Sequence, residues 1–195
     1  MLLGLTGSIG SGKSFIAGIL EHLDIPVYYS DIRAKELMIK PGIKEQIINL
    51  LGDDAYWSDG NLNRKYVAEK IFSDMDLKKA LESIVHSAVK KDFDLWVQEH
   101  AGSRLLVKES ALLIESGTYK DMDYVVVVTA PEAVRIRRVV ERDGLSEEEV
   151  RQRIRHQMPD EERIRFADFV LENSGNRLIL PQITEIFQKI AYHVV

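Results

Sequence analysis

Short apolar runs alternate with longer amphipathic stretches along this chain of 195 residues. Five runs bounded by polar, glycine or proline residues predict β-strands at Met1–Thr6, Ile25–Tyr29, Arg104–Lys108, Tyr124–Val128 and Phe169–Leu171. The intervening residues show the helical period at Lys13–Leu23, Ile32–Ile39, Leu77–Glu99 and 131–142. Strands that alternate with helices predict an α/β fold, with a doubly wound parallel sheet of five strands covered by helices on both faces.

The order of these elements predicts a single domain with two helical insertions. The core comprises roughly residues 1–40, 103–130 and 166–195, and the insertions lie roughly at 41–102 and 131–165. In the second insertion, Gly144 suits a helix C-cap, and Ser146 with Glu149 has the pattern of a capping box. Because ligands of open α/β sheets bind outside the carboxyl ends of the strands, we expect both insertions to cover that edge.

Composition narrows the class of protein. The chain contains no cysteine, which excludes a disulfide framework and a thiolate metal site and fits a reducing compartment. A net charge of −5 argues against nucleic acid as a bulk partner. No apolar run approaches the roughly 20 residues that span a bilayer, and the N-terminus lacks a signal-peptide pattern. We therefore expect a cytoplasmic protein with a small-molecule substrate and no nucleic-acid or membrane partner, as a monomer or weak homo-oligomer.

A complete Walker A pattern lies between the first predicted strand and the first predicted helix. It reads Gly7-Ser8-Ile9-Gly10-Ser11-Gly12-Lys13-Ser14. Small residues let successive backbone N–H groups surround phosphate oxygens, and the helix directs its positive end at the same anion. Lys13 can reach the β- and γ-phosphates, and the Ser14 hydroxyl can ligate Mg²⁺. We predict that this loop and Phe15 bind ATP·Mg²⁺.

Two other classes of P-loop protein fit the sequence less well. Guanine-specific switches use Asn-Lys-x-Asp and Asp-x-x-Gly, but no asparagine here precedes a lysine and no aspartate has glycine three residues later. An ATPase that acts on a macromolecule usually needs more mass than this chain has beyond its core. The pattern favours a phosphotransferase.

Arginine supplies all of the formal positive charge between residues 121 and 188. Arg135, Arg138 and Arg142 share one helical face by their spacing. A guanidinium fork binds phosphate oxygens in pairs, so we assign Arg138 and Arg142 to the phosphates of ATP. Arg151 follows a glutamate by four residues, which is typical of a solvated ion pair on a helix surface.

Asp31 follows the second predicted strand and has two candidate roles. Its carboxylate can accept the proton of an acceptor hydroxyl group and orient that group for attack. Aspartate is also a common N-cap, and Asp31 could cap the helix at Ile32–Ile39. Spacing alone favours the cap, and the two roles are compatible. Glu109, at the end of the third strand, could steady Mg²⁺ through water or could be solvated.

Further motifs follow the Walker A pattern in a fixed order. They are Tyr29-Ser30-Asp31, Asp59-Gly60-x-Leu62-x-Arg64, Leu81-Glu82-x-Ile84-Val85-His86, Leu112-Leu113-Ile114-Glu115, Arg138-x-x-x-Arg142, Gln157-Met158 and Asn173-x-Gly175. Together they resemble the dephospho-coenzyme A kinase family over nearly the whole chain. Ser8 stands where that family usually has glycine, and Ser87 stands where proline is usual.

The resemblance implies ATP- and Mg²⁺-dependent phosphorylation of the ribose 3′-hydroxyl of dephospho-coenzyme A, the last step of coenzyme A synthesis. It also implies a P-loop NTPase core like that of adenylate kinase, an acceptor-binding insertion at 41–102 and an arginine-bearing lid at 131–165. By this likeness Asp31 is the catalytic base and acts with Lys13 and Arg142. The likeness further places Asp31, Arg64, His86 and Glu115 on the acceptor side and Asn173 near the adenine of ATP.

Two alternatives also fit the sequence. Another nucleotide or small-metabolite kinase would keep Lys13 and the lid arginines but use the helices of 41–102 for a different acceptor. A non-catalytic nucleotide-binding protein is the second alternative. The lid arginines and Asp31 argue against it, because a pure binder needs no acceptor base.

Overall fold

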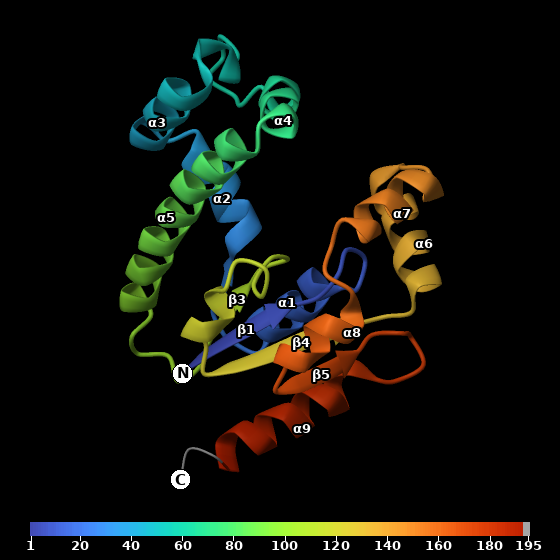
Figure 1. Cartoon of the computed structure of the whole chain (residues 1–195). Helices are drawn as coiled ribbons and strands as arrows, with labels where there is room; N and C mark the ends of the chain where they lie inside the picture. The colour runs from blue at the N-terminus through green and yellow to red at the C-terminus, as the bar shows by residue number, and fades with distance from the viewer. Residues whose placement is uncertain (193–195) are drawn as a thin grey trace. The chain divides into compact units, whose positions relative to one another are not determined.

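The computed structural model describes residues 1–192 and divides the chain into two compact units (Figure 1). The first unit contains Met1–Val27 and the chain from Gly102 onward, and the second contains Tyr28–Ala101. The first unit carries most of the sheet with the helices around it, whereas the second is built from helices. Among residues 1–192, no helix combines the length and apolar character needed to cross a bilayer.

Five strands form one sheet in the described part of the chain, in the order β2-β3-β1-β4-β5. Their bounds are β1 Leu2–Thr6, β2 Val27–Tyr29, β3 Leu106–Glu109, β4 Tyr124–Thr129 and β5 Phe169–Glu172. The central strand β1 pairs in parallel with β3 and β4, and β4 pairs in parallel with β5. The prediction of a five-stranded parallel sheet is confirmed. The strand expected from Ile25 begins later, at Val27, after Pro26, which has no N–H to donate.

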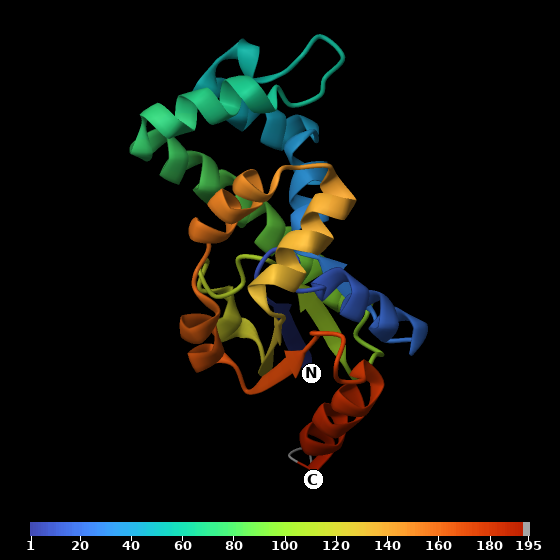
Figure 2. The ribbon, with the colours of Figure 1, turned by 90° about the vertical axis from the view of Figure 1, so that its right-hand side faces the viewer.

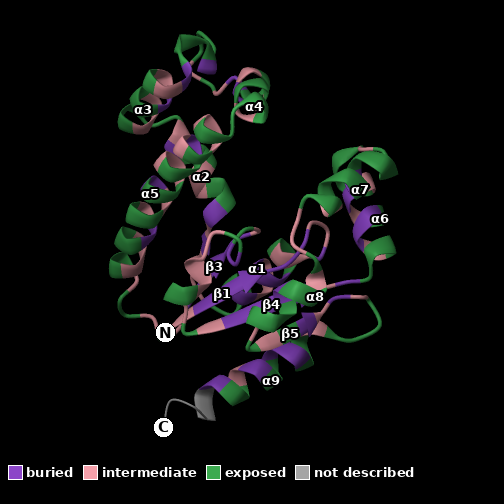
Figure 3. Cartoon of the chain, in the orientation of Figure 1, coloured by how far each residue is buried: buried purple, intermediate pink, exposed green. Residues whose placement is uncertain are grey.

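The core of the first unit lies on both faces of β1 and β4. The four valines at 125–128 are all buried, as a parallel strand covered on both sides requires (Figure 3). Burial of one such side chain stabilises the fold by about 1.5–3 kcal/mol, so this short run alone contributes substantially. Because β1 pairs with this buried strand, the loop that follows β1 starts from the core of the sheet.

Helices of the first unit flank the sheet and extend beyond it. Their bounds are α1 Lys13–His22, α6 Glu132–Asp143, α7 Glu147–Arg155, α8 Asp160–Arg163 and α9 Ile179–Tyr192. Helices α6 and α7 lie side by side (Figure 2) and share a small core of Ile136, Val139 and Val150. Gly144 ends α6 in the left-handed conformation, and the Ser146–Glu149 capping box begins α7. Both predictions for these caps are confirmed.

The second unit packs four helices around its own core. They are α2 Ser30–Met38, α3 Pro41–Leu51, α4 Arg64–Ser73 and α5 Met75–Glu99. Ile47, Leu51 and Leu81 are buried together in this core. Helix α5 starts before the predicted Leu77 because Asp74 caps it. Asp74 Oδ1 accepts hydrogen bonds from the backbone N–H groups of Asp76 and Leu77.

Candidate phosphate-binding site

The phosphate loop, residues Gly7–Gly12, connects β1 to α1 in the first unit. Ser11 N donates a hydrogen bond of 3.1 Å to Ser8 O across the turn. Gly10 and Gly12 have φ values of 77° and 96°, which favour glycine. A Cβ on Gly10 would lie 2.5 Å from the Arg135 carbonyl oxygen, and one on Gly12 would overlap the Asn173 amide. Only glycine permits both this turn and this close packing.

Helix α1 presents its N-terminus and a lysine at the same loop. It begins at Lys13, and Gly12 in the left-handed conformation is its N-cap residue. Lys13 Nζ donates to Gly7 O at 2.8 Å and lies 3.5 Å from Ser8 O. Ser14 and Phe15, in the first turn, are exposed. The ammonium group and the positive end of the helix thus concentrate positive charge where the sequence predicts phosphate.

Two side chains from distant segments hold Gly10–Gly12, the second half of the loop. Asn173, which follows β5 and is 7% exposed, donates from Nδ2 to Ser11 O at 2.9 Å. Arg138 of α6 directs Nη1 to Gly10 O and Ser11 O and Nη2 to Asn173 Oδ1, each at 3.4 Å. The structure therefore brings together two predicted nucleotide-site residues, Arg138 and Asn173.

A partly buried ionic cluster holds the first half of the loop. We call it the Ser8 cluster, and it consists of Ser8, Glu115, Asp160 and Arg163. Ser8 Oγ donates to Asp160 Oδ1 at 2.5 Å and accepts from Arg163 Nη1 at 2.6 Å. Arg163 Nη2 donates to Glu115 Oε1 at 2.6 Å, and the arginine side chain is 0% exposed. Glu115, predicted on the acceptor side, here pairs with Arg163.

Sequence reasoning missed Arg163 and Asp160 as neighbours of the loop. Their i,i+3 spacing is visible in the sequence, but it is equally typical of a solvated pair on a helix surface. In the sequence, Ser8 is marked only as a residue that stands where the family usually has glycine. Its contact with a residue 155 positions away depends on the tertiary fold and has no local signal.

Arg142 and Glu109 are two further predicted site residues of the first unit, and the contacts described for them are not with the phosphate loop. Arg142, expected at the phosphates, forms a two-point contact with Asp143 and its side chain is 63% exposed. This contact raises the pKa of Arg142 and lowers that of Asp143. Glu109 is a buried residue of β3, opposite Leu5 of β1. Of the two assigned arginines, Arg138 is the one whose contacts reach the loop in the structure.

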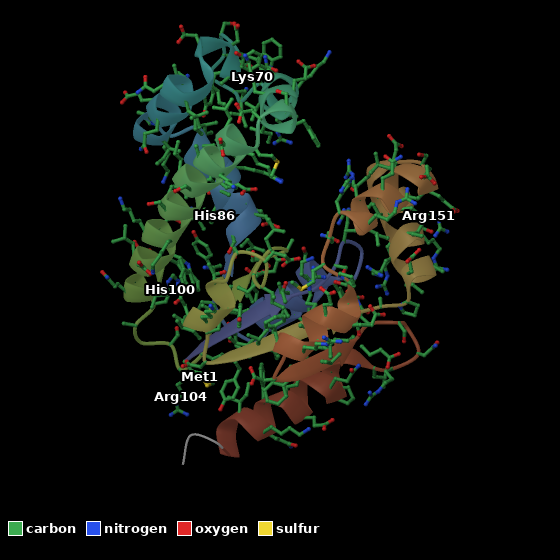
Figure 4. The ribbon with its side chains drawn as sticks, in the orientation of Figure 1. Met1, Lys70, His86, His100, Arg104 and Arg151 are labelled. Carbon is green, nitrogen blue, oxygen red and sulfur yellow. The ribbon has the colours of Figure 1, made fainter. Side chains whose placement is uncertain are left out.

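The remaining predicted residues belong to the second unit. Asp31 is exposed in the first turn of α2, whose N-cap residue is Tyr29, so the expectation that Asp31 caps this helix is wrong. The helix begins two residues earlier than predicted. Arg64 is the first residue of α4, and His86 is exposed near the middle of α5 (Figure 4). Asp31 and His86 therefore leave polar groups accessible to solvent.

Comparisons with known proteins identify the family that shares this sequence and fold. A family model described as dephospho-CoA kinase matches residues 1–178. A dephospho-CoA kinase from Bacteroides fragilis is 38% identical over 195 residues, covering 97% of this chain and 95% of the relative. One from Salinibacter ruber is 42% identical and covers 89% and 88%. A crystal structure from Thermus thermophilus, 34% identical, has a TM-score of 0.82 and covers 100% of this chain and 98% of that one.

Proposed function

The chain belongs to the dephospho-CoA kinase family, and we propose that it transfers the γ-phosphoryl group of ATP to the ribose 3′-hydroxyl of dephospho-coenzyme A. The products are coenzyme A and ADP, so the reaction completes coenzyme A biosynthesis. The absence of cysteine from the sequence supports a cytoplasmic location for this enzyme.

The observation that carries this proposal is the geometry of the phosphate loop. Its glycine turns, the start of α1 and the Lys13 ammonium group converge within one unit. Arg138 adds a second cation from α6, in contact with the loop and with Asn173. Phosphoryl transfer depends mainly on positioning and on neutralising phosphate charge, and these groups supply both.

The reaction requires attack of the acceptor oxygen on the γ-phosphorus while the bond from that phosphorus to the β–γ bridging oxygen breaks. Lys13 stabilises the charge that develops on the departing ADP. Asp31, accessible in the first turn of α2, accepts the proton of the 3′-hydroxyl group. Arg142 binds the transferring phosphoryl group after its hydrogen bonds to Asp143 break and its guanidinium group donates to phosphate oxygens instead.

Magnesium fits the oxygen donors at this site. Ser14 presents an exposed hydroxyl group in the first turn of α1, next to Lys13. Oxygen is the ligand that Mg²⁺ prefers, and the ion usually keeps several waters while it binds nucleotide phosphates. Bound with ATP, Mg²⁺ would offset phosphate charge during transfer.

We further propose that the two insertions divide the substrates. The helices of 41–102 receive dephospho-coenzyme A, and Arg64 and His86 contribute to that side. The α6–α7 pair is the lid over ATP. This division is supported by the separate helical core of the second unit and by the contact of Arg138 with the phosphate loop.

The test is an ADP-release assay with ATP·Mg²⁺ and a panel of acceptors. We expect kcat/KM for dephospho-coenzyme A to be at least about 10²-fold higher than for nucleoside monophosphates or sugars. The reason is that these smaller acceptors would leave polar groups of the acceptor site without hydrogen-bond partners. Preference for a nucleoside monophosphate or another metabolite would establish a different small-molecule kinase. If the protein binds nucleotide but forms no ADP with any acceptor, it is a nucleotide-binding protein without kinase activity.

A further inference from the structure

Arg163 differs from the other arginines of this chain because its side chain is completely buried and its guanidinium group is shared among three partners. Nη1 donates to Ser8 Oγ and lies 3.5 Å from Asp160 Oδ1, while Nη2 donates to Glu115 Oε1. Arg135, itself 8% exposed, places Nη2 at 3.7 Å from Asp160 Oδ2, the other oxygen of that carboxylate. Two arginines and two carboxylates thus balance their charges around one serine hydroxyl group.

That hydroxyl group belongs to the phosphate loop. Ser8 is 2% exposed and uses Oγ both as a donor to Asp160 and as an acceptor from Arg163. The next residue is held from the same side, since Ile9 N donates to Gln157 Oε1 at 2.8 Å. The segment Gln157–Arg163, which follows α7, therefore holds the first half of the loop through two consecutive residues.

Glycine at position 8 would permit the turn, but it has no side-chain oxygen to accept a hydrogen bond from Arg163. The serine instead gives the loop a side chain through which a buried charge can act. Burial of an arginine has a large desolvation cost unless its donors are satisfied. Ser8 and Glu115 each accept a hydrogen bond from one terminal nitrogen, whereas the buried Nε has no hydrogen-bond partner. Charge-assisted hydrogen bonds in such surroundings are short and directional, so they fix the position of the groups they join.

We propose that Arg163 is a positioning residue of the nucleotide site, which acts through the Ser8 hydroxyl group to hold the phosphate loop ready for the triphosphate of ATP. The proposal rests on the function proposed above only in taking ATP as the nucleotide. Arg163 does not contact the reacting atoms in this role. Its effect is on the conformation of Ser8 and Ile9, so it should control nucleotide affinity more than the rate of the chemical step.

The experiment compares Arg163→Lys and Ser8→Ala, alone and combined, with Arg155→Lys as the matched control. Arg155 pairs with Glu148 on the surface at 2.7 Å with its side chain 62% exposed, so its replacement tests loss of an arginine away from the loop. ATP affinity is measured by calorimetry without any acceptor. KM and kcat are then measured with dephospho-coenzyme A. The first measurement stands even if the acceptor proposed above is wrong.

Lysine keeps the positive charge of Arg163 but cannot bridge Ser8 and Glu115 with a planar fork. We expect ATP to bind about tenfold more weakly to Arg163→Lys, the scale of one charge-assisted hydrogen bond. The KM for ATP should rise by the same factor, while the KM for dephospho-coenzyme A and kcat stay within about threefold. In the Ser8→Ala background the same change should weaken ATP binding by less than about threefold, because the hydroxyl group that transmits the effect is gone.

Two results would overturn the proposal. One is a lower melting temperature for Arg163→Lys with unchanged ATP affinity, which would make Arg163 a structural residue only. The other is full additivity of the two substitutions in ATP affinity, which would show that Arg163 does not act through Ser8. The control Arg155→Lys should leave ATP affinity unchanged.

Discussion

Each unit contains a partly or fully buried arginine, and the two arginines are used differently. In the second unit, Arg33 of α2 places Nε and Nη2 on the two oxygens of Asp92 of α5, at 2.8 and 2.7 Å. Its side chain remains 38% exposed, and Tyr28 OH donates to the same carboxylate at 2.8 Å. In the first unit, Arg163 is fully buried and divides its donors between the phosphate loop and Glu115.

The difference separates a structural contact from a functional one. Arg33 binds both oxygens of Asp92 on α5 and donates from Nη1 to Glu36 of its own helix at 3.0 Å. These contacts join two helices and give stability to their unit. The Arg163 guanidinium group, in contrast, binds both Ser8 of the phosphate loop and Glu115, so it fixes the position of that loop. Substitutions in the second contact should therefore change ligand binding, and substitutions in the first should change melting.

The largest effect is expected at Asp31. Because Asp31 is not the N-cap of α2, Asp31→Asn should leave the melting temperature nearly unchanged. Asparagine cannot accept a proton at neutral pH, so turnover with dephospho-coenzyme A should fall about 10²–10⁴-fold, with ATP affinity retained. Steady-state kinetics and thermal melts measure both quantities. Asp76→Asn is the matched control, since Asp76 lies in the first turn of α5. Full activity of Asp31→Asn would exclude Asp31 as the base and make Glu109 the next candidate.

Lys13→Ala should lower turnover at least about 10²-fold, because the ammonium group stabilises charge on the departing phosphate. The fold should persist, because Lys13 is not one of the buried residues of the core. Lys189→Ala, which removes a surface pair with Glu185, serves as control. Near-normal turnover of Lys13→Ala would mean that this loop is not the catalytic phosphate site.

The lid arginines should differ among themselves. Arg138→Lys should lower kcat/KM for ATP by about 10–100-fold, the scale of lost charge-assisted hydrogen bonds. Arg142→Lys should have a smaller effect, because Arg142 must first leave Asp143. Arg151→Lys should be nearly silent, since Arg151 pairs with Glu132 and Glu147 on the surface. Equal kinetics for all three variants would contradict the division between site and surface.

The smallest effect on activity is expected at Asp92. Asp92→Asn should destabilise the protein by about 1–2 kcal/mol, allowing for the partial solvation of Arg33, and should leave ATP affinity unchanged. Chemical denaturation and calorimetry measure these two quantities. A loss of ATP affinity without loss of stability would reverse the comparison between the two arginines.

The same carboxylate predicts a pH dependence of stability. Arg33, followed by Tyr28, lowers the pKa of Asp92 below its ordinary value in the folded protein. The ionised form is therefore favoured by folding, so its contribution is complete above about pH 4, the unfolded value. It is lost as the pH falls through the lower folded pKa. The difference in melting temperature between wild type and Asp92→Asn should shrink over this acidic range, and a constant difference would contradict the assignment.

The sequence predicted those parts of the molecule that depend on local chemistry. The Walker A pattern, the valines at 125–128, the Gly144 cap and the Ser146 capping box carry their signals within a few residues. The start of α2 was misplaced because Asp31 satisfies an N-cap pattern wherever it precedes a helix. The Ser8 cluster could not be predicted, because it joins positions more than forty residues apart through the packing of α8 against the loop.

The most direct test of the central claim is identification of the product. The protein is incubated with ATP·Mg²⁺ and dephospho-coenzyme A, and the acceptor is analysed by mass spectrometry and phosphorus NMR, with Lys13→Ala as the inactive reference. The account predicts one added phosphoryl group per ADP released, as a monoester on the ribose 3′-oxygen. Unmodified dephospho-coenzyme A, or phosphate on any other oxygen, would contradict it.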